Sequence, residues 1–63
     1  MKTVKFMPGH YRVVSDDKFA HIHKDGRKWY ATIRALNGDL IRYAGIWNTL
    51  KDAIEESERL LRQ

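Results

Sequence analysis

The feature that most constrains this chain is an Asn-Gly dipeptide, Asn37-Gly38, that stands between two apolar-rich runs. Both residues tolerate the positive φ that a tight hairpin turn requires, so the dipeptide predicts a β-hairpin. A second turn signal, Asp25-Gly26, precedes the first of these runs. We therefore expect three strands, over residues 19–23, 28–36 and 39–47.

A helix is expected after the third strand. Thr49-Leu50-Lys51-Asp52 is a variant of the capping box, in which a hydroxyl and a carboxylate satisfy free backbone N–H groups. Small and apolar residues then recur at helical spacing, at Leu50, Ala53, Ile54, Ser57 and Leu61. The predicted fold class is α+β, a three-stranded antiparallel sheet packed on one C-terminal helix, over residues 19–63. Residues 1–18 are expected to be a basic, partly disordered lead, with a break at Pro8-Gly9 and a short strand at residues 11–14.

Composition excludes several classes of protein. The 63 residues include no cysteine, which excludes disulfides, thiolate chemistry and cysteine-based zinc sites. No apolar run approaches the ~20 residues that span a bilayer, and the N-terminus lacks the apolar stretch of a signal peptide. We therefore expect a cytoplasmic protein with no membrane partner.

The charge is unevenly distributed along the chain. Residues 1–49 hold nine Lys/Arg and four Asp/Glu, whereas residues 50–63 hold three Lys/Arg and four Asp/Glu. Positive charge is thus expected on the sheet and not on the helix. A sequence pI near 9.7 is typical of proteins that bind polyanions.

Side-chain alternation assigns the two faces of the predicted sheet. In the middle strand the helix-facing set is Trp29, Ala31, Ile33 and Ala35, and both Trp29 and Trp47 are expected in the core. In the third strand Leu40 and Ala44 fit the core, whereas Arg42 breaks the alternation. Arg42 either reaches around the sheet edge or marks a bulge near Gly45.

The other face collects cations, imidazoles and aromatic rings: Phe19, His21, His23, Lys28, Tyr30, Thr32, Arg34, Ile41 and Tyr43. Cations neutralise phosphates, and a β-sheet can enter the major groove of duplex DNA. We therefore predict a small DNA-binding protein, with double-stranded DNA as its partner. The alternatives are a solvated sheet face with no ligand, and a homodimer or protein-interaction module that uses the same residues.

Two stretches, RKWYATIR at residues 27–34 and GIWNTLKDA at residues 45–53, resemble the DNA-binding domain of plant ethylene-response factors. That family shares its three-strand-plus-helix plan with the arm-site-binding N-terminal domains of phage tyrosine integrases. The resemblance implies a sheet in the major groove, with DNA contacts from His21, His23, Lys28, Thr32, Arg34, Ile41 and Tyr43. Because histidines replace arginines in the first strand, integrase-like use in a phage or mobile element is the closer analogy.

A second resemblance covers Phe19, Lys24-Asp25-Gly26, Trp29-Tyr30 and the run ALNGDLI at residues 35–41. These residues look like the uncharacterised YegP-like repeat family, whose units are strand-strand-strand-helix. This resemblance implies the same fold and no activity.

Catalytic and metal chemistry find little support in the sequence. His21-x-His23 places two imidazoles on one strand face, a spacing that metal sites use, but a third ligand would have to be His10, Asp16 or Asp25. There is no Gly-rich phosphate loop and no nucleophile-base set, and the carboxylates cluster on the predicted helix. We therefore expect a protein that is not an enzyme and has no cofactor or metal.

Overall fold

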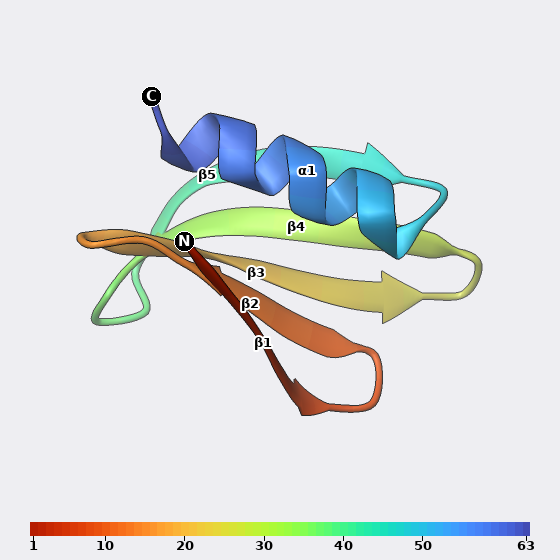
Figure 1. Ribbon diagram of the computed structural model, residues 1–63. Helices are drawn as coiled ribbons and strands as arrows, with labels where there is room; N and C mark the ends of the chain where they lie inside the picture. The colour runs from red at the N-terminus through yellow and green to blue at the C-terminus, as the bar shows by residue number, and fades with distance from the viewer.

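Strands in chain order form one antiparallel sheet, and a C-terminal helix lies across one of its faces (Figure 1). The computed structural model describes residues 1–63, apart from the side chain of Phe6. Over these residues the elements are β1 (Lys2–Met7), β2 (His10–Val14), β3 (Lys18–Asp25), β4 (Lys28–Ala35), β5 (Leu40–Trp47) and α1 (Leu50–Leu61). Each strand pairs with the next along the chain, so the sheet is a simple meander.

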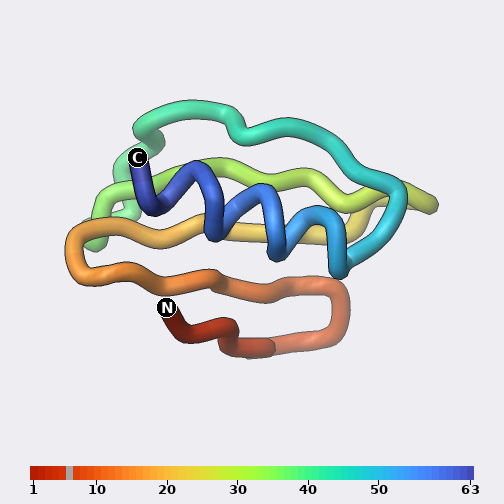
Figure 2. The backbone as a smooth tube through the Cα atoms, turned by 45° about the horizontal axis from the view of Figure 1, so that its top comes forward, coloured from red at the N-terminus to blue at the C-terminus, as the bar shows by residue number. Residues whose placement is uncertain are grey.

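The predicted α+β class, with an antiparallel sheet and a C-terminal helix, is confirmed, but the predicted number of strands was wrong. The sheet has five strands, because residues expected to form a lead supply β1 and β2. Pro8-Gly9 is the turn of this extra hairpin, and Gly9 has a φ of 79°. Figure 2 shows the hairpin, in red and orange, continuing the meander beyond β3. Pairing of β2 with β3 satisfies an edge of β3 that three strands would leave open.

A turn at Asn37-Gly38 and the predicted helix start are both present, but only Gly38 adopts the positive φ that was expected of both turn residues. At the Asn-Gly turn the Gly38 N–H donates to the Ala35 carbonyl over 2.9 Å, and the Asp39 N–H donates to the Asn37 side chain over 3.0 Å. At the helix start, the Thr49 hydroxyl accepts a hydrogen bond from the Asp52 N–H over 3.1 Å. Local chemistry therefore fixes both ends of β5.

The core lies between α1 and the sheet and is rich in small residues. Its buried members are Val13, Ala20, Ile22, Ala31, Ile33, Ala53 and Leu61. Trp29 and Trp47 pack against this cluster as partly buried side chains, in agreement with their expected core positions. The alanines allow α1 to approach the sheet closely. Most of the hydrophobic stabilisation therefore comes from a small number of larger buried side chains, such as Ile22 and Ile33. No helix in the described part of the chain is long and apolar enough to cross a membrane.

Strand β5 departs from regular alternation at two points. Its register against β4 shifts between Ala31 and Thr32 and again between Ile33 and Arg34. Arg42 lies opposite the core residue Ile33 on an edge strand and is nevertheless exposed, so a bulge near Gly45 and a side chain at the sheet edge are both present. Leu40 was wrongly assigned to the core, because these shifts place it opposite Arg34 with 44% of its surface exposed.

Candidate nucleic-acid interface

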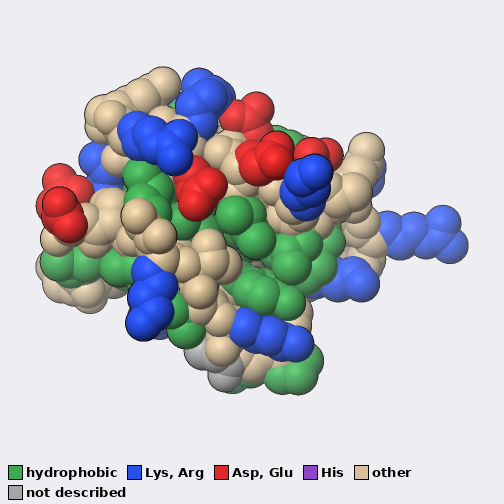
Figure 3. Space-filling view, viewed as in Figure 1, with side chains coloured by type: hydrophobic (Ala, Val, Ile, Leu, Met, Phe, Trp, Pro, Cys, Tyr) green, Lys and Arg blue, Asp and Glu red, His purple; other side chains and the backbone are tan. Residues whose placement is uncertain are grey.

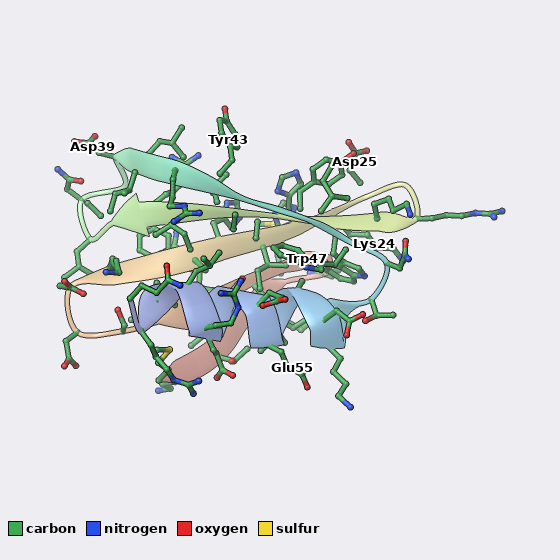
Figure 4. All side chains as sticks on the ribbon, turned by 90° about the horizontal axis from the view of Figure 1, so that it is seen from above. Lys24, Asp25, Asp39, Tyr43, Trp47 and Glu55 are labelled. Carbon is green, nitrogen blue, oxygen red and sulfur yellow. The ribbon has the colours of Figure 1, made fainter. Side chains whose placement is uncertain are left out.

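The sheet face that points away from α1, called the open face below, is built from three rows of residues that run across the strands. Figure 4 shows its orientation, with Tyr43 projecting away from α1 and Trp47 projecting towards it. From β1 to β5, the first row is Met7, His10, His23, Tyr30 and Ile46, the second is Val4, Arg12, His21, Thr32 and Tyr43, and the third is Lys2, Val14, Phe19, Arg34 and Leu40.

Three histidines form a cluster at the centre of the open face, called the imidazole cluster. The ring centroids of His10 and His21 are 5.7 Å apart, those of His21 and His23 are 5.8 Å apart, and those of His10 and His23 are 6.3 Å apart. The Tyr30 ring extends the cluster onto β4, stacked 5.5 Å from His23. No group of three or more histidine or acidic side chains among the described residues could hold a metal ion.

Two arginines stand beside the imidazole cluster. The Arg12 guanidinium lies 4.8 Å from the centroid of the Phe19 ring, a cation–π geometry. Phe19 lies on the open face as expected but is only 7% exposed, so it is not available as a contact residue. Arg34 Nε donates to the Thr32 hydroxyl over 3.2 Å and Arg34 Nη1 donates to the Gly38 carbonyl over 2.9 Å. These bonds orient the Arg34 guanidinium and use two of its five N–H donors.

Negative charge lies outside the three rows. Among their described side chains there is no carboxylate, and the acidic residues lie in turns, at strand ends and on α1. Figure 3 shows acidic side chains on the helix side of the molecule. An anion on the open face would therefore meet cations without a competing carboxylate among the described residues of the three rows.

The surroundings of His21 lower its pKa. Partial burial is the largest cause, followed by the charges of His23, His10, Arg34 and Arg12. Each of these disfavours the protonated imidazole. At neutral pH the positive charge on the open face therefore comes from the two arginines more than from His21.

Acid should destabilise the fold through His21. An unfolded histidine has a pKa of about 6.5, and the folded-state pKa of His21 lies below that value. The unfolded chain therefore binds more protons below about pH 6.5, and stability falls until the pH has passed the folded-state pKa. We expect a lower urea midpoint at acid pH than at about pH 8, and a smaller difference in His21→Gln. An equal pH dependence in the two proteins would contradict this assignment.

A shallow depression of about 400 Å³ opens on the open face, over β3, β4 and β5. Its lining is predominantly apolar and consists of His23, Tyr30, Ala31, Thr32, Tyr43, Gly45 and Ile46. Tyr43 is 75% exposed and Ile46 is 56% exposed, so two large apolar side chains stand open to solvent beside it. This depression is called the groove below.

The predicted contact residues fall into two groups. Those that the structure brings together on β3, β4 and β5 are His21, His23, Tyr30, Thr32, Arg34 and Tyr43. Lys28 is the first residue of β4, where its ammonium group contacts the Asn48 side-chain oxygen. Ile41 lies at a bulge in β5, outside the regular pairing.

His10, Arg12 and Ile46 are among the open-face residues that sequence reasoning did not place there. The first two lie on β2, where they alternate with Tyr11 and the core residue Val13. That alternation is the signal that could have placed them. Ile46 was missed because the bulges in β5 interrupt the alternation from which its face would be read.

Comparisons of the chain with protein-family models, curated proteins and solved structures found no match. The open face is therefore the feature of the molecule from which a function is inferred.

Proposed function

We propose that this protein binds nucleic acid through the open face. The observation that supports the proposal is the position of Arg12 and Arg34, on the two strands that flank His21, on a face whose described rows carry no carboxylate. Arginine presents a fork of N–H donors that matches phosphate oxygens. Neutralised phosphates release condensed counterions, which is the main source of sequence-independent affinity.

Arg34 is held in one orientation and is thereby prepared for a phosphate. Its hydrogen bonds to Thr32 and Gly38 restrain the side chain before any ligand arrives. Binding would therefore lose less side-chain entropy at Arg34 than at an unrestrained surface lysine. Duplex DNA, the partner expected from the sequence, and single strands both carry the phosphates that these cations recognise.

The proposal is tested by removing both arginines and measuring the salt dependence of binding. Fluorescence anisotropy with short random-sequence oligonucleotides should show that the Arg12→Ala, Arg34→Ala double variant binds more weakly than the wild type. Loss of two phosphate contacts should reduce the slope of log K against log salt by about 1.8 for a duplex or about 1.4 for a single strand.

A matched control changes the net charge equally on the helix side. Lys51→Ala with Arg62→Ala also removes two positive charges, but both lie on or next to α1. This control should bind with nearly wild-type affinity and an unchanged slope. Absence of binding to every oligonucleotide at low salt, or equal losses in the two double variants, would overturn the proposal.

A further inference from the structure

We infer that the preferred ligand is a single-stranded nucleic acid, with an unpaired base seated in the groove between Tyr30, Tyr43 and Ile46. This inference rests on the proposed function and specifies the form of its ligand. The phosphates would lie towards β2 and β3, near Arg12 and the imidazole cluster.

The width of the sheet argues against insertion into a duplex groove. Neighbouring strands are about 4.8 Å apart, so the outer strands of this sheet lie about 19 Å apart. The major groove of B-DNA is about 12 Å wide, which admits two or three strands. The strands β1 and β2, which the sequence did not predict as part of the sheet, therefore turn a groove-sized sheet into a broad platform. A flexible single strand can lie across a platform of this width.

The groove has the chemistry of a base-stacking site. It is lined mostly by apolar atoms, and Tyr43, which lies at its side, keeps 75% of its surface exposed. Every base has a π-face that can stack on an exposed aromatic ring, whereas a base pair within a duplex is already stacked. The Tyr30 ring, stacked on His23, supplies a second aromatic surface in the same groove.

The spacing between Arg12 and the groove allows one nucleic-acid strand to contact both. Arg12, His21, Thr32 and Tyr43 are successive members of one row, so Arg12 lies three strand spacings, or about 14 Å, from Tyr43. A strand whose base stacks on Tyr43 can therefore run its backbone along the row towards Arg12. The groove and the cations form one continuous surface on the open face.

The positive charge of the open face favours a nucleic-acid strand over a second copy of the chain as the ligand of the groove. The exposed apolar residues of β5 could pack in a sheet-to-sheet dimer. A two-fold dimer through the open face would, however, bring the Arg12 and Arg34 side chains of both copies into the same interface. A polyanion neutralises these charges, whereas a second copy doubles them.

The inference is tested by separating the contribution of the base from that of the phosphate. Anisotropy is measured with a duplex, a single-stranded DNA, a single-stranded RNA and an abasic strand of equal length. The wild type should bind the single strands more tightly than the duplex and the abasic strand. Tyr43→Ala should weaken single-strand binding about 5- to 150-fold, whereas Tyr43→Phe should retain it. The DNA and RNA arms establish which sugar is preferred.

The control is Leu36→Ala, which removes an exposed apolar side chain in the turn after β4 and outside the groove. It should leave all affinities unchanged. If the arginine pair proves essential but duplex and abasic strands bind as well as intact single strands, the inference fails and the proposed function stands. If no oligonucleotide binds, both fail. Sedimentation that shows a stable dimer dissociated by Tyr43→Ala would assign the groove to a second copy and overturn the inference.

Discussion

Ile22→Ala is expected to lower the free energy of unfolding by about 2–5 kcal/mol. Ile22 is fully buried in the middle of β3, and the core around it consists largely of alanines. A 63-residue domain has a free energy of unfolding of about 3–9 kcal/mol, so this substitution removes a large part of it. Thermal unfolding followed by circular dichroism should show the midpoint falling by about 10 °C or more.

The control for this substitution is Ile41→Ala. It deletes the same atoms from a strand residue that is 54% exposed. Its midpoint should stay close to that of the wild type. Similar losses at Ile22 and Ile41 would show that the core does not lie where the structure places it.

Gly45→Ala should produce the second-largest loss of stability, because two effects combine. Gly45 has a φ of 145°, which L side chains rarely adopt and which costs about 1–3 kcal/mol. An added Cβ would also lie 3.3 Å from the Trp47 Cζ2 and Cη2 atoms. The Trp47 ring must then shift from its position against the core, so the near-ultraviolet circular dichroism spectrum should change together with the melting temperature.

Gly38→Ala separates these two effects. Gly38 also has a positive φ, of 97°, but a Cβ added there has no heavy atom within 4 Å. It should therefore lose stability through the backbone alone and leave the tryptophan signal unchanged. A Gly45→Ala protein no less stable than Gly38→Ala, with an unaltered spectrum, would contradict the proposed contact with Trp47.

The elements that the sequence predicted well are those fixed by local chemistry. The Asn37-Gly38 turn, the Thr49 cap and the helical stripe each depend on a few neighbouring residues, and the corresponding strands and helix lie within about two residues of their predicted bounds. Strand β1 was missed because Pro8-Gly9 was interpreted as a break in a lead rather than as a hairpin turn. A Pro-Gly pair between two runs of alternating residues is compatible with both interpretations until the pairing partner is known.

Part of the candidate site could be predicted in the same way. Strand alternation placed His21, His23, Tyr30 and Arg34 on one face, because β3 and β4 pair without a shift in register. Alternation failed on β5, where two bulges change which residues face the helix. The groove could not be predicted, because it is formed by side chains from three strands at the point where one of these bulges occurs.

The sequence by itself determined the class of the fold, the turns at Asp25-Gly26 and Asn37-Gly38, the helix and the uneven distribution of charge between residues 1–49 and 50–63. These follow from backbone preferences and periodicity, which act over a few residues. Only the tertiary structure decided that β1 and β2 extend the sheet, that Arg12 and His10 join His21 and His23, and that Phe19 is buried. These are contacts between residues distant in sequence, and the register of strand pairing, which propensity does not specify, determines which of them form.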